Sequence, residues 1–237
     1  MNIGLLIAGG KGERMGQDIP KQFLHIENKP IIIYTLEAFQ EHPSIDAILV
    51  VCVDGWHDIL RAYANQYGIT KLKWIVSGGN TGQESIYNGL NTLSGICGDN
   101  DIVLIHDAIR PMVSKDIISD CIAKSTIYGS AITTIPCAEA ILVSDDGFTS
   151  SKSANRETLK RTQTPQGFKF EKIMQAHKKA ADLGITNSVA SCTLMIEIGD
   201  SVYFSQGSEK NIKLTTVEDI EIFKALLNTG KDTYLKG

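Results

Sequence analysis

Short apolar runs alternate with helical stretches through most of this 237-residue chain, and this alternation limits the fold more than any other feature. Residues 47–53 form a continuous apolar run, which is typical of a strand covered on both faces of a parallel sheet. Residues 30–41 instead carry Ile32, Leu36 and Phe39 at helical spacing. Strand and helix patterns that alternate in this way predict a doubly wound α/β fold with a mostly parallel sheet.

The same patterns give approximate boundaries for a Rossmann-like sheet and its covering helices. Strands are expected at residues 3–8, 47–53, 73–77, 102–106, 130–135 and 201–205. Helices are expected at residues 30–41, 56–67, 83–93, 114–128, 169–183 and 216–227. A chain of this length suits one large domain, so residues 1–237 are expected to form a single domain.

The alternation breaks between Pro136 and Lys160. Residues 140–144 and Phe148 look like two strands joined by a turn at residues 145–147, and the stretch that follows is polar. A hairpin that projects from a sheet exposes strand edges, and such edges commonly need a partner to cover them. Residues 136–160 are therefore expected to form a projecting β-hairpin arm used in a homodimer, with a mobile surface hairpin as the alternative.

Composition narrows the partners and the compartment. The net charge of −4 argues against nucleic acid, because phosphate backbones are bound by clustered Lys and Arg. Apolar runs such as residues 102–105 are far shorter than the roughly 20 residues of a membrane span, and the N-terminus lacks the basic leader of a signal peptide. Five scattered cysteines without a C-x-x-C pair are typical of reduced thiols, so a cytoplasmic protein is expected.

A glycine-rich loop follows the first expected strand. The strand runs into Gly9, Gly10 and Gly12, and a strand that ends in glycines leaves main-chain N–H groups free to hold phosphate oxygens. Arg14 and Lys21 flank the loop, where their charges can neutralise a polyphosphate. The loop therefore predicts a phosphate-binding site, with a tight turn bearing surface cations as the structural alternative.

Two familiar phosphate loops fit this segment poorly. The dinucleotide pattern G-x-G-x-x-G needs its third glycine one residue before Gly16, and no acidic residue closes a second strand about 20 residues further on, since Asp54 is too distant. The Walker A pattern fails because no glycine is followed by Lys-Ser or Lys-Thr. A glycine loop that carries its own arginine and lysine better suits a free nucleoside triphosphate.

The pattern L-x-A-G-G-x-G-x-R-M-G followed by P-K-Q resembles the cytidylyltransferases of small polyol phosphates. Members of that family act on 2-C-methyl-D-erythritol 4-phosphate or on ribitol 5-phosphate. The resemblance runs through nearly the whole chain in further motifs, namely Gly78-Gly79, Ser85, His106-Asp107-Ala108-Ile109-Arg110-Pro111, Thr164-Pro165-Gln166 and Asn211-Ile212-Lys213.

The resemblance implies a donor site for CTP and Mg²⁺. It assigns catalytic roles to Arg14, Lys21 and Lys213, metal binding to Asp107, and nucleotide binding to Ala8, Gly9, Gly10, Gly12, Gly79, Asn80, Ser85, Asp107 and Ala108. Asp107 follows an expected strand, and ligands of open α/β sheets bind at the carboxyl ends of the strands. A carboxylate there can hold Mg²⁺. The residues alone leave open a capping or salt-bridged Asp107 and a solvated Lys213.

On the acceptor side the resemblance implies that Arg156 reaches across a dimer to the acceptor phosphate, and that Thr164 also contacts the acceptor. This half of the site departs from the family pattern. The arm reads Cys137-Ala138-Glu139-Ala140 where the erythritol-phosphate enzymes have a threonine after an aspartate, and residues 185–193 lack their acidic run. Asn80 and Gly82 also replace usual residues of the base-reading loop. Of these departures, the missing threonine and acidic residues favour ribitol 5-phosphate slightly, because specificity comes from matched polar groups. Asn80 and Gly82 bear instead on how strictly the base is chosen.

The expected reaction is a direct in-line attack of the acceptor phosphate on the α-phosphorus of CTP, which releases pyrophosphate. Three alternatives stay open. One is a nucleotidyltransferase that uses another base, the second is a nucleotide-binding regulator without activity, and the third is an NAD-dependent oxidoreductase. Pyrophosphate release and a panel of nucleotides would separate them.

Overall fold

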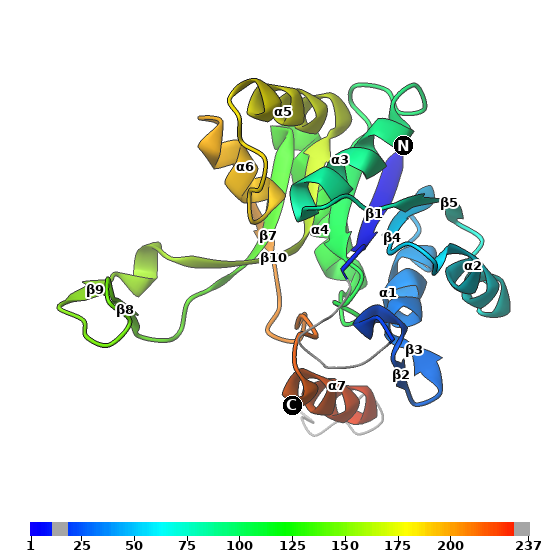
Figure 1. The fold of residues 1–237 in the computed structure, drawn as a ribbon, viewed down its shortest axis with the longest axis horizontal. Helices are drawn as coiled ribbons and strands as arrows, with labels where there is room; N and C mark the ends of the chain where they lie inside the picture. The colour runs from blue at the N-terminus through cyan, green and yellow to red at the C-terminus, as the bar shows by residue number, and fades with distance from the viewer. Residues whose placement is uncertain (11–18, 230–237) are drawn as a thin grey trace.

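The computed structural model describes residues 1–10 and 19–229. Its centre is a seven-stranded sheet in the order β11-β7-β10-β6-β1-β4-β5 (Figure 1). The strands of this sheet are β1 (Asn2–Ala8), β4 (Ala47–Cys52), β5 (Leu72–Ser77), β6 (Ile102–Asp107), β7 (Ser130–Pro136), β10 (Lys160–Lys169) and β11 (Phe204–Gln206). The α-helices are α1 (Ile31–Gln40), α2 (His57–Gln66), α3 (Gly82–Leu93), α4 (Lys115–Tyr128), α5 (Phe170–Asp182), α6 (Ser191–Glu197) and α7 (Val217–Thr229).

The sheet is mostly parallel, as the alternation predicts. Strand β1 pairs in parallel with β4 and β6, β4 pairs in parallel with β5, and β11 pairs in parallel with β7. Only β10 runs antiparallel to its neighbours, β6 and β7. The fold class expected from the sequence is therefore confirmed, with one antiparallel strand inserted near its centre.

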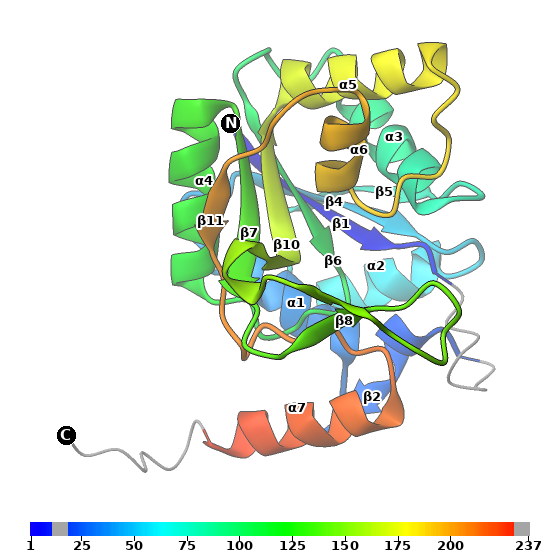
Figure 2. The same ribbon diagram turned by 90° about the vertical axis from the view of Figure 1, so that its left-hand side faces the viewer.

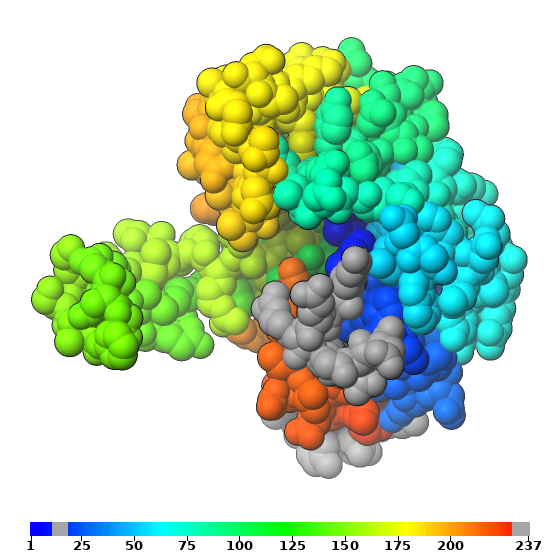
Figure 3. Space-filling view, viewed as in Figure 1, coloured from blue at the N-terminus to red at the C-terminus, as the bar shows by residue number. Residues whose placement is uncertain are grey.

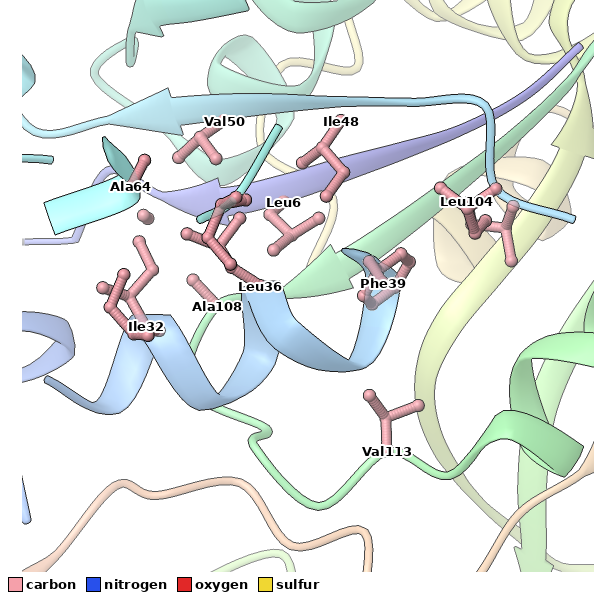
Figure 4. Packing of buried hydrophobic residues seen from close by; sticks show 14 of the residues in the cluster. Leu6, Ile32, Leu36, Phe39, Ile48, Val50, Ala64, Leu104, Ala108 and Val113 are labelled. Atoms are coloured by element: carbon pink, nitrogen blue, oxygen red, sulfur yellow. The ribbon is translucent and has the colours of Figure 1, made fainter. Parts of the chain in front are cut away.

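Helices cover both faces of the sheet (Figure 2). Side chains of α1, α2 and α4 share one buried cluster with Leu6 of β1, whereas α3, α5 and α6 share another with Leu5. Consecutive strand residues point to opposite faces, so one apolar strand serves both clusters. Figure 4 shows Leu36 of α1 packed against Leu6. Gly4 lets α1 lie close to β1, because a Cβ atom at this position would be only 2.6 Å from a ring carbon of Phe39 on α1.

The arm is present, but its strands differ from the expected ones. Strands β8 (Ile141–Val143) and β9 (Lys152–Ala154) pair antiparallel and project from the body of the molecule (Figures 1 and 3). The expected strand at Phe148 is wrong, since this residue lies in the connection between the strands. Asp146 Oδ1 accepts the main-chain N–H groups of Phe148 and Thr149, at 2.9 and 2.8 Å, and so builds a wider turn than the sequence predicts.

Three further elements were not expected. Strand β10 carries polar residues where a buried strand normally has apolar ones. Helix α6 lies between the expected helix 169–183 and the expected strand 201–205, where no element was expected. Strands β2 (His25–Ile26) and β3 (Lys29–Pro30) form a small hairpin near α7. The last sheet strand is also shorter and later than the expected range 201–205. Pattern reading failed here because each segment is short or buries polar groups.

Two expectations from composition can be compared with the structure. All five cysteines lie in the described part of the chain, and none forms a disulfide there. Within residues 1–10 and 19–229, no helix combines the length and the apolar character that crossing a membrane requires.

His177 of α5 provides a prediction about stability. Its side chain is 95% buried beside Tyr87, and burial lowers its pKa from the usual 6.5 to about 4. Between about pH 6.5 and pH 4, the imidazole of His177 is therefore protonated in the unfolded chain but neutral in the folded chain. We expect this group to lower the free energy of unfolding by on the order of 2 kcal/mol as pH falls from about 6.5 to 4.

Urea unfolding of the wild type and of His177→Leu at pH 7 and pH 4.5 measures this contribution. The leucine variant lacks the titrating group, so its stability should fall less between the two pH values. Carboxylates titrate equally in both proteins and cancel in the comparison. An equal fall in the two proteins would contradict the assignment of the effect to His177.

Candidate active site

A cavity of about 610 Å³ opens at the carboxyl edge of the sheet. The loops after β1, β5 and β6 form one side of it, and the middle of β10 and the start of α6 form the other. Parallel strands bring their carboxyl ends to one edge, which is where open α/β sheets bind ligands. Residues that line the cavity include Ala8, Gly9, Gly10, Lys21, Gly79, Asn80, Ser85, Asp107, Arg110, Thr164, Gln166, Ser191 and Lys213.

The start of the glycine-rich loop is held by Gln22. This side chain is buried on the short helix Lys21–Phe23, and its amide nitrogen donates to the carbonyl oxygens of Ala8 (2.7 Å) and Gly10 (3.1 Å). Because these carbonyls are tied back, the path of the chain out of β1 is fixed beside the cavity. The predicted residues Gly12 and Arg14 lie outside the described residues.

The loop between β5 and α3 is shaped by side chains of that helix. Ser85 Oγ accepts the N–H of Gly79 at 2.9 Å, and Glu84 accepts the N–H of Asn80 at 2.7 Å. Thr81 caps the helix by accepting the N–H of Glu84 at 3.1 Å. A Cβ atom on Gly79 would lie only 2.3 Å from the Glu84 side chain, so the turn needs glycine at this position. These contacts fix the shape of this wall of the cavity.

Asp107, the last residue of β6, is held by two cations. Its carboxylate lies 3.0 Å from Arg110 Nε and 3.1 Å from Lys213 Nζ, with one oxygen facing each. Burial by itself raises the pKa of this carboxyl group, but the positive charges of Lys213 and Arg110 outweigh burial and the pKa lies below its usual value. The group is therefore ionised at neutral pH.

His106 lies behind Asp107 and is fully buried. Its Nε2 atom is 3.2 Å from the carbonyl oxygen of Arg110, and its Nδ1 atom is 3.0 Å from Thr164 Oγ1. Burial lowers the pKa of this imidazole to about 4, so the ring is neutral at pH 7. Thr164 Oγ1 also accepts the N–H of Asp107 at 3.1 Å, which ties β6 to β10 at the cavity.

The loop that carries Lys213 is anchored on both sides of that residue. Asn211 is fully buried, and its amide nitrogen donates to the carbonyl oxygen of Thr164 at 2.8 Å. Leu214 is also buried, and its N–H donates to the carbonyl oxygen of Ile109 at 2.9 Å. These anchors bring a loop from the end of the chain to Asp107 and leave the Lys213 side chain at the cavity.

The segment 185–193 contributes to the cavity in spite of its altered sequence. Residues 188–191 line the wall opposite the glycine loop. Gln83 of α3 donates to the carbonyl oxygen of Ile185 (2.7 Å) and accepts the N–H of Ser188 (2.8 Å). Gln166 of β10 accepts the N–H of Cys192 at 2.9 Å. Two glutamines therefore hold this segment, and it presents serine, valine and alanine where acidic residues were expected in the family.

Most of the predicted site residues come together, and two do not. Ala108 lies outside the cavity lining, because it is buried in the core under α1 (Figure 4), where its N–H donates to Ile7. Arg156 lies on the exposed arm, where it donates to the carbonyl oxygen of Ala138 at 3.2 Å, and it does not line the cavity of its own chain.

Several residues of the site received no role from the sequence. Five of them stand inside motifs that carry the family resemblance, namely Gln22, His106, Arg110, Gln166 and Asn211. A motif does not tell which of its residues faces the ligand and which supports its neighbours. Gln163 lies just before one such motif, and its side chain bonds Asn211 and Ser208.

The arrangement suits an anionic ligand that brings its own metal. Lys21, Arg110 and Lys213 line the cavity together with the carboxylate of Asp107. In the described parts of the chain, no group of three or more His, Cys, Asp or Glu side chains is placed to hold a metal. One carboxylate is nevertheless enough for Mg²⁺ when phosphates and waters supply the remaining ligands. The site therefore fits a metal–polyphosphate complex.

Comparison with known proteins gives a consistent picture. Residues 3–229 match the profile of the family described as IspD, 2-C-methyl-D-erythritol 4-phosphate cytidylyltransferase. The chain is 45% identical to the ribitol-5-phosphate cytidylyltransferase of Lacticaseibacillus paracasei, over 96% of this chain and 98% of the relative. It is 39% identical to the 2-C-methyl-D-erythritol 4-phosphate cytidylyltransferase of Clostridium botulinum strain Loch Maree, over 95% and 97% of the two chains.

A solved structure shows the same fold. The 2-C-methyl-D-erythritol 4-phosphate cytidylyltransferase from Thermus thermophilus superposes with a TM-score of 0.77 at 25% identity. The match covers 96% of this chain and 100% of that one. The fold is thus similar over nearly the full length of both chains.

Proposed function

The chain belongs to the IspD family of cytidylyltransferases, and on this premise we propose that it transfers the cytidylyl group of CTP to a polyol phosphate, with ribitol 5-phosphate as the favoured acceptor. The observation that carries this proposal is the placement of Lys213, Arg110 and Asp107 between the glycine loop and the wall formed by β10. A reacting phosphate at this point would lie between the donor loops and the acceptor wall.

The donor half supports a nucleoside triphosphate. The start of the glycine loop and Lys21 would hold the phosphates, together with Arg14. Gly79, Asn80 and Ser85 line the cavity beside the start of the glycine loop, where the base would lie. An acceptor phosphate oxygen attacks the α-phosphorus, a new P–O bond forms, and the bond to the β-phosphate oxygen breaks to release pyrophosphate. Lys213 stabilises the charge that develops on the α-phosphate.

Mg²⁺ is proposed as the metal, with Asp107 as its protein ligand. Bound with the triphosphate, Mg²⁺ would neutralise phosphate charge during the transfer. Arg110 and Lys213 hold the carboxylate in place and ionised, which is the state a metal needs. Asp107 thus serves orientation and metal binding, whereas Lys213 acts on the reacting phosphate.

The acceptor half supports an uncharged polyol chain that ends in a phosphate. Thr162, Gln163, Thr164 and Gln166 line this side with amides and hydroxyls, and residues 188–191 add no acidic group. A polar wall of this kind suits an acceptor rich in hydroxyls, because a site selects polar substrate groups by matching them with its own. The greater similarity to a relative named for ribitol 5-phosphate agrees with this choice.

We further propose a single-domain cytoplasmic homodimer built through the arm, without nucleic acid or membrane as partner. The arm carries Ile141, Leu142, Val143 and Phe148 with exposed fractions of 37, 68, 44 and 95%. So many exposed apolar side chains on a thin projection favour a partner that covers them. In such a dimer Arg156 would reach the acceptor phosphate in the partner's cavity.

A pyrophosphate-release assay tests the function. With CTP and Mg²⁺, we expect kcat/KM for ribitol 5-phosphate to exceed that for 2-C-methyl-D-erythritol 4-phosphate by about 100-fold or more, since unmatched polar groups are strongly rejected. A preference for methylerythritol phosphate would overturn the acceptor. A preference for UTP, ATP or GTP would overturn the donor. CTP binding without pyrophosphate release from any polyol phosphate would indicate a regulator, and NADH binding in place of CTP would indicate an oxidoreductase.

A further inference from the structure

The hydrogen bonds around His106 can be assigned a direction. The carbonyl oxygen of Arg110 can only accept, so the hydrogen of the neutral imidazole lies on Nε2, 3.2 Å from that oxygen. Because the ring is fully buried, the uncharged form with a single hydrogen is favoured, so Nδ1 accepts from the hydroxyl group of Thr164, 3.0 Å away. The imidazole therefore holds the carbonyl of Arg110 on one side and the hydroxyl of Thr164 on the other.

The hydroxyl oxygen of Thr164 takes the place of a main-chain acceptor just past the end of the β6–β10 ladder. The antiparallel ladder between β6 and β10 ends at the pair Ile105–Gln166, and the register of β10 shifts between Thr162 and Gln166. On its β10 side, the N–H of Asp107 donates to Thr164 Oγ1 at 3.1 Å instead of to a carbonyl of the ladder. A side-chain relay from Asp107 through Thr164 to His106 thus joins the two strands at the cavity.

The relay closes into a ring through Arg110. The guanidinium of Arg110 donates to the Asp107 carboxylate at 3.0 Å and to the carbonyl oxygen of Asn211 at 2.8 Å. Asn211 in turn donates to the carbonyl oxygen of Thr164 at 2.8 Å. The ring therefore contains the carboxylate, the acceptor-side threonine and the loop that carries Lys213. Two neighbouring residues bind both the Thr164 side chain and the Arg110 main chain: Asp107 does so through its own main chain, and His106 does so through its imidazole ring.

We propose that His106 is a positioning residue for the transfer reaction, which fixes Thr164 and Arg110 and thereby sets the geometry of Asp107 and Lys213. Its ring is fully buried and packs against Phe39, with ring centroids 5.1 Å apart, so it acts through its neighbours and not on the substrate. Since the hydroxyl proton of Thr164 is directed to His106, Thr164 can accept a hydrogen bond from the polyol but cannot donate one to it. This inference rests on the proposed cytidylyl transfer.

Matched substitutions separate positioning from packing. His106→Phe keeps a planar ring but removes both hydrogen bonds, whereas His106→Asn keeps an acceptor near the position of Nδ1. We expect His106→Phe to lower kcat by about 10- to 100-fold, because small misplacements of reacting groups cost rates of this order, with KM for each substrate changed less than about threefold. His106→Asn should recover most of the loss. Thr164→Val should lower kcat as His106→Phe does and should also raise KM for the polyol phosphate, because it removes the oxygen that accepts from the polyol. Thr164→Ser should behave like the wild type.

The coupling between the two residues provides a stricter test. The kcat of the double variant His106→Phe/Thr164→Val should be no lower than that of the worse single variant, since both substitutions remove the hydrogen bond that His106 and Thr164 share. A wild-type kcat in His106→Phe would overturn the proposal, and so would multiplicative losses in the double variant. A Thr164→Val variant that only raises the KM of the polyol phosphate would assign Thr164 to direct binding and would also overturn it. If His106→Phe does not unfold cooperatively in a thermal scan, Thr164→Val and Thr164→Ser decide the question.

A spectroscopic measurement distinguishes this proposal from the proposed function. The ¹⁵N shifts of His106 should show a hydrogen on Nε2 and a hydrogen-bonded acceptor at Nδ1, and Thr164→Val should move the Nδ1 resonance towards that of a free acceptor. The opposite tautomer, or an unchanged Nδ1 resonance, would overturn the relay. This measurement needs no substrate, so a wild-type enzyme inactive with CTP and ribitol 5-phosphate would count against the function alone.

Discussion

Replacing Lys213 with alanine is expected to lower kcat by about 10²- to 10³-fold, the usual cost of removing one preorganised group that stabilises transition-state charge. The expectation rests on its placement. The neighbouring Asn211 and Leu214 are buried and hydrogen-bonded, so the Lys213 side chain is delivered to the cavity by a fixed loop. KM for CTP should change much less than kcat, because the α-phosphate gains most of its charge only in the transition state.

The same loop offers a matched control. Lys210 is exposed and does not line the cavity, so Lys210→Ala removes a charge from the loop without touching the site. Its kcat should stay within about threefold of the wild type. Lys213→Arg should retain part of the rate, since it keeps the charge but not the shape of the ammonium group. Steady-state kinetics with CTP and ribitol 5-phosphate, with thermal unfolding to check the fold, decides the matter. A Lys213→Ala variant with wild-type kcat would remove this lysine from the mechanism.

The parallel part of the fold could be predicted from the sequence because apolar side chains dictate it. Strand β4 is a continuous apolar run, β6 begins with four apolar residues, and α1 shows its buried face at helical spacing. Strand β10 could not be found in this way. Its buried residues include Gln163 and Gln166, whose amides satisfy main-chain groups of other segments, so its pattern follows hydrogen bonding and not hydrophobicity.

The candidate site could be predicted as a set of motifs but not as a geometry. Asp107 and Lys213 are 106 positions apart, and only the fold brings them within 3.1 Å of each other. The supporting role of Gln22 depends on carbonyl groups that have no signature in the sequence. For Ala108, membership in a motif suggested contact with the nucleotide, although the side chain serves the core. A short motif therefore contains both residues that face the ligand and residues that only support the structure around them.

Arg156→Ala is expected to lower kcat/KM for the polyol phosphate by about 100-fold, because a guanidinium that binds a phosphate contributes charge-assisted hydrogen bonds. In its own chain Arg156 is exposed and bonds the carbonyl of Ala138, away from the cavity. The loss should therefore arise in the active site of the partner protomer. Arg161→Ala is the matched control, since Arg161 stands near the base of the same arm and pairs with Glu209 of its own chain at 3.3 Å.

Hybrid dimers reveal which protomer supplies the arginine. When Arg156→Ala and Lys213→Ala chains are co-expressed with different tags, each hybrid dimer contains one cavity with an intact Lys213 and the partner's intact Arg156. Its other cavity lacks both residues. Purified hybrids should recover about half of the wild-type activity, and a random mixture about one quarter, although each parent is nearly inactive. If Arg156 served its own cavity, every cavity would lack one group and the hybrids would stay as inactive as their parents. A protein that elutes as a monomer in size-exclusion chromatography would exclude the exchange altogether, because an arm without a partner cannot complete a second site.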